Sequence, residues 1–220
     1  MTGSPSPLNA GARRAATIAP AVVVFAATFG LVAQDAGLGP VASIVMSATT
    51  FAGSAQFAAA SVLSAAGSVT AAATAAILLN ARYVPIGISV AGVIRGRPLR
   101  RLLEAQLVVD ESWAFARRPD GRFDRGLLIG AGLVLYVCWV GGTAAGAYGG
   151  EALGDPDSLG LDAAFAALFL ALLIPQLRSP RAIVVAVAGG LIAFILIPFT
   201  SPGVPIIAAG AASLIGWRRP

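Results

Sequence analysis

Long apolar runs separated by short polar segments dominate the chain. A helix that crosses a bilayer needs roughly 20 apolar residues. Six stretches reach or approach that length: 15–33, 69–94, 126–148, 160–177, 182–199 and 203–217. The last one is short, but it ends at Trp217 and is followed by Arg218 and Arg219, which together make a suitable interfacial anchor. The pattern therefore predicts an all-α, polytopic transmembrane helical bundle with about six full spans.

Two further stretches, 41–66 and 102–116, fit a full crossing less well. The first is rich in small, weakly polar side chains, and the second is short and carries Glu104, Gln106, Asp110 and Glu111. We expect both to be re-entrant or broken segments. The alternative is that both cross, which gives eight helices, and 41–66 is long enough to do so as a helix. If only one of them crosses, the two chain ends lie on opposite sides of the membrane.

Composition agrees with a membrane protein. The chain is 57% hydrophobic and 11% charged, with a mean hydropathy of +0.84. Soluble domains carry about 25% charged residues, so a water-soluble fold of this length would lack polar cover. The net charge of +5 would suit nucleic acid, but the arginines form short clusters between apolar runs, which is typical of topology signals. We therefore expect a lipid bilayer as the surroundings and no nucleic-acid partner.

The arginine clusters also predict orientation. All 15 cationic residues are arginines, and cytoplasmic loops carry the excess of positive charge. With both ambiguous segments re-entrant, every arginine except Arg82 falls on the cytoplasmic side, together with the N and C termini. In the eight-helix alternative the Arg95–Arg101 loop would lie outside.

We divide the chain into a disordered cytoplasmic tail, 1–12, and a single transmembrane transport domain, 13–220.

Charges within apolar segments are the candidates for function. Arg82 lies near the middle of 69–94, where an unpaired charge costs about 2.5–3.5 kcal/mol on insertion scales. Pro85 leaves the carbonyl of Ala81 without its helical donor, so a kink or unwound turn is expected there. Asp110 and Glu111 are the natural counter-ions. The pair either fixes the bundle or binds a zwitterion, with Arg82 toward a carboxylate and the acids toward an ammonium or a coupling proton.

A third element is the heptapeptide 51–57, Phe-Ala-Gly-Ser-Ala-Gln-Phe. If Gly53 and Ser54 break the helix, a half-helix begins there and turns its positive dipole end toward a substrate. The alternative is a small-residue face that packs against a neighbouring helix.

The predicted substrate-binding residues are Gly53, Ser54, Gln56, Asn80, Arg82, Asp110 and Glu111. We expect no catalytic residue, no metal site and no cofactor, and the single Cys138 excludes an internal disulfide.

These residues resemble the AzlC family, the large subunit of branched-chain amino acid exporters. The resemblance covers roughly 17–118 and rests on Phe29-Gly30-Leu31, on the heptapeptide, on Asn80-Ala81-Arg82 with Gly87 and Ser89, and on Asp110-Glu111. It implies a gradient-coupled secondary transporter that exports small apolar amino acids across the bacterial cytoplasmic (inner) membrane. It also implies a small AzlD-type membrane subunit as partner.

The chain departs from the family pattern at two positions. Tyr83 stands where the family usually has His, and Ile86 where it tends to have Tyr. Because the chain has no His, proton coupling would use Asp110, Glu111 or Glu104. Gly142, Gly146 and Gly150 recur every four residues and can pack either against a partner helix or within the chain.

Two other classes of function remain as alternatives. A channel-like or structural membrane subunit would share the same composition. An intramembrane enzyme is less favoured, since Asp110 has no second intramembrane Asp as partner and a serine nucleophile would find neither His nor Lys. The absence of a Walker motif argues against direct use of ATP. We expect a transporter and not an enzyme.

Overall fold

The computed structural model describes residues 6–118, 120–153, 170, 173–174, 177, 179–200 and 204–212. Within these ranges the chain is helical, and the one β-bridge found there joins Arg117 to Phe123. The all-α prediction is confirmed. The elements are α1 (Pro7–Ala16), α2 (Ala19–Asp35), α3 (Gly39–Thr50), α4 (Gly53–Ser64), α5 (Val69–Asn80), α6 (Tyr83–Val90), α7 (Pro98–Ala105), α8 (Asp110–Ala116), α9 (Arg125–Leu153), α11 (Pro180–Leu196) and α12 (Val204–Ala211).

Two helices in the described ranges are long and apolar enough to cross a membrane: Arg125–Gly150 and Pro180–Phe199. The bent pairs α1–α2 and α5–α6 raise the number to four if each pair forms one span. The predicted stretch 160–177 lies almost wholly outside the described residues, and 203–217 lies partly outside them. The prediction of six spans and of cytoplasmic termini stays a prediction.

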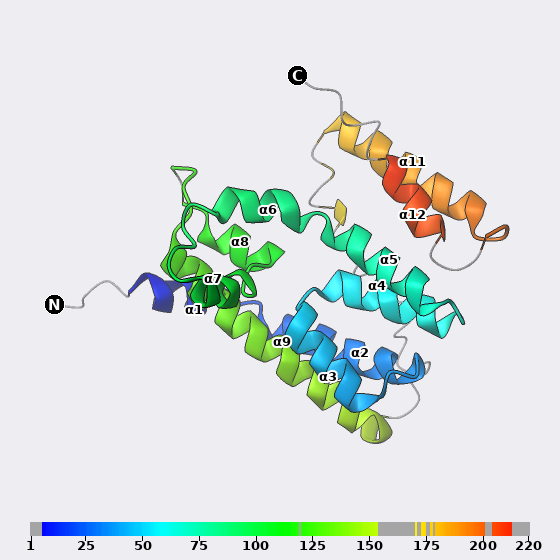
Figure 1. Ribbon diagram of the computed structural model, residues 1–220, viewed down its shortest axis with the longest axis horizontal. Helices are drawn as coiled ribbons and strands as arrows, with labels where there is room; N and C mark the ends of the chain where they lie inside the picture. Colours follow the sequence, from blue (N-terminus) through cyan, green and yellow to red (C-terminus); the bar gives the residue numbers. More distant parts are fainter. Residues whose placement is uncertain are drawn as a thin grey trace.

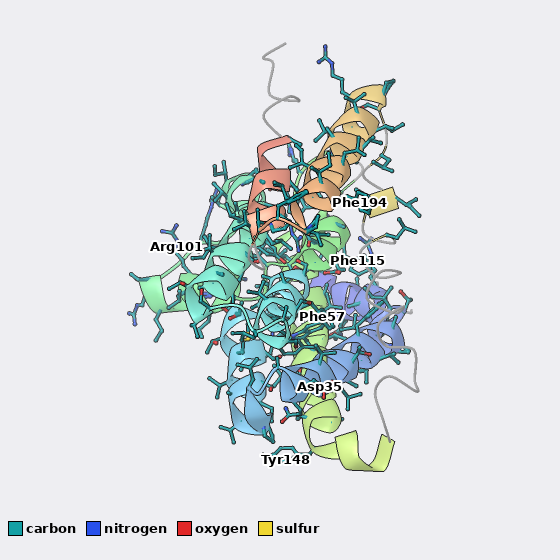
Figure 2. The ribbon with its side chains drawn as sticks, turned by 90° about the vertical axis from the view of Figure 1, so that its right-hand side faces the viewer. Asp35, Phe57, Arg101, Phe115, Tyr148 and Phe194 are labelled. Atoms are coloured by element: carbon teal, nitrogen blue, oxygen red, sulfur yellow. The ribbon has the colours of Figure 1, made fainter. Side chains whose placement is uncertain are left out.

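Helix α9 is the axis around which the first half of the chain packs. Helices α1, α2, α3 and α8 all contact it, and α2 packs in turn against α4 (Figure 1). Helices α11 and α12 form a separate hairpin that reaches the rest of the molecule where α12 contacts α5. Figure 2 shows Phe57 of α4 among the helices and Arg101 of α7 at the outer edge of the molecule.

The N-terminal segment differs from the disordered tail predicted for residues 1–12. Helix α1 begins at Pro7, and the hydroxyl of Ser6 accepts a hydrogen bond from the Asn9 N–H over 3.4 Å. Serine at the N-cap and proline in the first turn are helix-start signals, although the same composition also suggests disorder. Gly11 lies against the backbone of Leu127, so α1 packs on the start of α9. The expected disorder therefore does not hold for residues 7–12.

Glycines allow α2 and α9 to approach closely. A Cβ added at Gly142 would lie 2.6 Å from Cβ of Ala26 and 2.7 Å from the carbonyl oxygen of Val23. A Cβ at Gly146 would overlap the carbonyl group of Ala27. Of the two alternatives for these glycines, partner helix or own chain, the structure shows packing within the chain.

Both ambiguous segments contain a break. Helix α3 ends at Thr50 and is followed by Phe51, whose φ of 41° is left-handed; α4 starts at Gly53. The carbonyls of Ala48 and Thr49 accept hydrogen bonds from Gln106 Nε2 over 3.1 and 2.8 Å. Gln106 itself lies in the break between α7 and α8, so the two broken segments contact each other where their helices are interrupted. Their re-entrant course through the membrane stays a prediction.

The break between α5 and α6 lies where Pro85 predicts it. The two helices are bent by 41° at Ala81 and Arg82. Pro85 has no N–H to donate, and the Ala81 carbonyl accepts instead from the Val84 N–H over 3.1 Å. The predicted kink is confirmed, and it places Arg82 at the junction of two helices.

Candidate functional site

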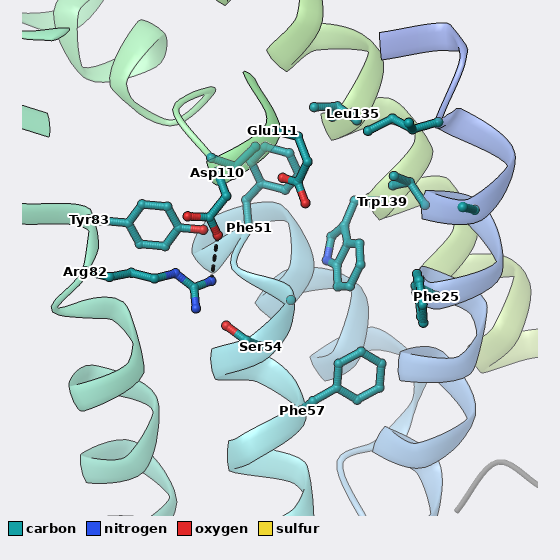
Figure 3. A pocket seen from close by; sticks show the side chains of 15 residues that line it. Phe25, Phe51, Ser54, Phe57, Arg82, Tyr83, Asp110, Glu111, Leu135 and Trp139 are labelled. Carbon is teal, nitrogen blue, oxygen red and sulfur yellow. Dashed lines mark ion pairs between the residues drawn. The ribbon is translucent and has the colours of Figure 1, made fainter. Parts of the chain in front are cut away.

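Arg82 and Asp110 form an ion pair in which Nη2 and Oδ2 lie 2.8 Å apart (Figure 3). Each side chain is 37% exposed. Asp110 is the first residue of α8, where the positive end of the helix dipole favours a carboxylate. The Arg82 guanidinium also lies over the ring of Tyr83, 5.2 Å from its centre. The segments 69–94 and 102–116 are thus joined through the charges that the sequence singles out.

A cavity of about 210 Å³ lies beside this ion pair. Typical sites for drug-sized ligands measure about 300–1,000 Å³, so this one suits a smaller molecule. Its polar lining includes Ser54, Arg82, Tyr83, Asp110 and Glu111. Its apolar lining includes Val22, Phe25, Phe51, Phe57, Leu135 and Trp139. Figure 3 shows Phe25, Leu135 and Trp139 on the side away from Arg82 and Tyr83. With its acids ionised, this lining holds one guanidinium and two carboxylates.

Three buried polar atoms near the ion pair make no hydrogen bond in the described structure: Ser54 Oγ, Asn80 Oδ1 and Arg82 Nε. The large majority of buried side-chain polar atoms in proteins are paired, so these three call for an explanation. Ser54 and Arg82 line the cavity, whereas Asn80 does not. The cavity can therefore offer a donor from Arg82 and a hydroxyl from Ser54 to a bound polar group.

Gln56, which the sequence predicts to bind substrate, does not line the cavity. Its side chain is fully buried, and Oε1 accepts hydrogen bonds from the Ala52 N–H over 3.3 Å and from Trp139 Nε1 over 2.9 Å. Its Nε2 donates to Ser47 Oγ over 2.9 Å, and that hydroxyl bonds Thr143 Oγ1 over 2.8 Å. The amide is occupied by internal partners and holds the broken segment against α9.

Gly53 is needed for a close approach between the start of α4 and an aromatic ring. A Cβ at this position would lie 2.7 Å from Cη2 of Trp139. The Trp139 ring in turn packs near Phe29 and Phe57, with ring centres 6.3 and 6.4 Å away. Any side chain at Gly53 would displace either the indole or the helix start, and both border the cavity.

Five of the seven predicted residues line one cavity: Gly53, Ser54, Arg82, Asp110 and Glu111. Trp139 is not among the residues predicted from the sequence, and Tyr83 is singled out there only as a departure from the family pattern. An indole N–H in the middle of a long apolar helix needs a polar partner, and that signal points to Trp139. No comparable local signal marks Val22 and Phe25 of α2.

Comparisons with known proteins agree with the resemblance drawn from the motifs. The profile of the AzlC protein family matches residues 17–153. An uncharacterized membrane protein of Archaeoglobus fulgidus is 34% identical over 208 residues, which cover 90% of this chain and 89% of that protein. The inner membrane protein YgaZ of Escherichia coli K12 is 28% identical over 204 residues, or 85% and 82% of the two chains.

A third relative carries a functional name. The branched-chain amino acid transport protein AzlC of Bacillus subtilis is 29% identical over 151 residues, which cover 67% of this chain and 59% of that protein. No solved structure matches the chain. The family match includes all seven predicted site residues and also Trp139.

Proposed function

Because the chain belongs to the AzlC protein family, we propose that it is a secondary transporter that exports small apolar amino acids, branched-chain ones among them. Its relatives are named as membrane proteins, and one is named for branched-chain amino acid transport. The chain is therefore a membrane protein of a transport-associated family. The export direction, the coupling to an ion gradient and the place in a bacterial inner membrane belong to the proposal.

The observation that carries the proposal is the two-sided lining of the cavity. On one side Arg82 Nε and Ser54 Oγ have no protein partner, and both can bond the carboxylate of an amino acid. Glu111 supplies a negative group for the ammonium. On the other side Phe25, Trp139 and their apolar neighbours receive an aliphatic side chain. A small zwitterion with an apolar side chain satisfies both sides at once.

The start of α4 strengthens the carboxylate side. Gly53 and Ser54 form its first turn and line the cavity, so the positive end of the helix dipole borders the bound anion. Broken helices hold substrates in this way in other secondary transporters. Arg82 is held by Asp110 over 2.8 Å, and a substrate carboxylate would replace that partner. The released Asp110 would then take up a proton or face the substrate ammonium. Binding of substrate in the cavity would thereby be coupled to the charge of Asp110.

The proposal includes a small membrane subunit of the AzlD type. Gly142 and Gly146 contact α2, so such a subunit would bind another surface. Helix α11 has no buried residue and exposes Phe194 and Ile195, so its apolar surface is open to lipid or to a partner.

The experiment that tests the proposal is counter-flow of labelled amino acids in proteoliposomes, with and without a co-expressed AzlD-type subunit. We expect saturable exchange of leucine, isoleucine and valine, and little exchange of lysine or glutamate, whose charged side chains the aromatic wall would desolvate. Ion currents without saturable amino-acid exchange would contradict the proposal and favour the channel alternative.

A further inference from the structure

A second cavity, of about 550 Å³, lies next to the first. It is formed by α6, by α7 and by Val108, which precedes α8. Its lining and that of the first cavity share a single residue in the described structure, Tyr83. Tyr83 therefore borders both spaces.

We propose that the second cavity is the vestibule through which the amino acid reaches the first cavity, and that Tyr83 is the partition between them. This inference rests on the proposed function and deepens it, because it assigns a route and a selective element to the same site.

The chemistry of the second cavity fits a zwitterion that carries an aliphatic side chain. Val90, Ile94 and Leu102 provide aliphatic walls. Arg101 is the one charged residue in the described lining, and it lies at the outer edge of the molecule (Figure 2). A guanidinium at the mouth of an apolar space attracts a carboxylate, while the walls accept the side chain. Arg101 and then Arg82 would meet the same carboxylate in succession.

Tyr83 is placed to respond to movement of the helices on either side. It is the first residue of α6 and directly follows the 41° break at Ala81 and Arg82. Its half-buried ring lies beside the Arg82 guanidinium, and Figure 3 shows its hydroxyl turned toward Asp110. A change in the angle between α5 and α6 would move the ring relative to the ion pair. Passage between the cavities would then be linked to the state of that pair.

Gly87 gives a direct test, because it lines the second cavity one turn after Tyr83. A Cβ at Gly87 would meet no atom within 4 Å, so a larger side chain can enter the cavity without overlapping the fold. Gly92 is a matched control, since its Cβ position is equally open and it lines neither cavity. We would introduce Gly87→Cys or Gly92→Cys into a Cys138→Ser background and reconstitute each protein in liposomes.

Exchange of labelled leucine is then measured before and after full reaction with N-ethylmaleimide or with a bulkier maleimide. The same folded protein serves as its own reference. We expect modification of Gly87→Cys to slow exchange on the order of tenfold or more, and the bulkier reagent to slow it further. Modified Gly92→Cys should exchange at its unmodified rate.

Each outcome decides a different point. A fully labelled Gly87→Cys protein that exchanges leucine at its unmodified rate would show that the second cavity is not on the route, and the proposed function would stand. If the unlabelled proteins exchange no amino acid at all, the proposed function fails and the vestibule fails with it.

The role of Tyr83 has a separate readout in substrate selectivity. Tyr83→Phe keeps the ring and should keep the wild-type ratio of tryptophan to leucine exchange. Tyr83→Ala joins the two cavities and should raise that ratio on the order of tenfold, because a larger side chain then fits. A parallel fall of both rates in Tyr83→Ala, with the ratio unchanged, would overturn the partition.

Discussion

The indole Nε1 of Trp139 donates a hydrogen bond to Oε1 of Gln56 over 2.9 Å. Through this bond α9 holds the start of α4, which is also the edge of the cavity. The Gln56 oxygen accepts from the Ala52 N–H as well, so the same amide satisfies the backbone at the helix break. Gln56 therefore supports the start of α4 and does not line the cavity.

The first prediction concerns this amide. Gln56→Leu leaves the indole N–H and the Ala52 N–H without an acceptor in a buried region. Each such loss costs about 1–3 kcal/mol, so we expect the free energy of unfolding to fall by about 2–6 kcal/mol. Thermal unfolding in detergent measures the effect. Gln34→Leu is the control, because Gln34 is only half-buried and bonds Gly30 and Ser43 away from the break. Equal melting temperatures for the two variants would contradict this role.

The second prediction concerns the contact between Gly53 and Trp139. Gly53→Ala places a Cβ about 2.7 Å from the indole, and overpacking of this kind costs about 1–3 kcal/mol. We expect weaker leucine binding together with lower thermal stability. Trp139→Phe replaces the indole with a smaller phenyl ring. Combined with Gly53→Ala it should restore part of the leucine binding, and a double-mutant cycle measures this coupling. Gly190→Ala, at an open helical position, should leave binding unchanged. Strictly additive effects of the two changes would argue against direct contact.

How much of the site the sequence can predict depends on the range of each interaction. Pro85 marks the break before α6 because the missing N–H acts within one helical turn. The sequence predicts Asp110 and Glu111 as the counter-ions of Arg82, because each charge is costly alone in an apolar segment. The partner of Gln56 lies 83 residues away in α9, and that of Gln106 lies 58 residues away in α3. No local pattern specifies such contacts, so the sequence alone does not place Gln56 against Trp139 or Gln106 against α3.

The third prediction uses two glycines on different faces of α9. Gly146 touches the backbone of Ala27, whereas a Cβ at Gly149 would meet nothing within 4 Å. Replacing glycine by alanine within a helix stabilises it by up to about 1 kcal/mol when the site is free. Gly149→Ala should therefore raise the melting temperature slightly. Gly146→Ala should lower it, because α2 and α9 must move apart. Destabilisation of similar size in both variants would contradict the close packing at Gly146.

The fourth prediction concerns the side on which the arginine loop lies. Leu99 is 69% exposed and sits between Arg97 and Arg100. In the re-entrant arrangement this loop is cytoplasmic, so Leu99→Cys in a Cys138→Ser background should react with an impermeant maleimide only in inside-out vesicles. The neutral replacement leaves the positive charge of the loop unchanged. Labelling in intact cells would instead support the eight-helix arrangement.

The last prediction separates a structural role of the Arg82–Asp110 pair from a role in transport. Arg82→Ala and Asp110→Asn should each abolish leucine exchange while the protein still inserts in the membrane and elutes as a folded species. The charge-swapped double variant, Arg82→Asp with Asp110→Arg, can re-form an ion pair and should recover part of the thermal stability. It should not recover exchange, because position 82 then carries a carboxylate beside the Ser54 hydroxyl and the start of α4, where we propose that the substrate carboxylate binds. Recovery of both stability and exchange in the swapped protein would mean that the pair only fixes the bundle.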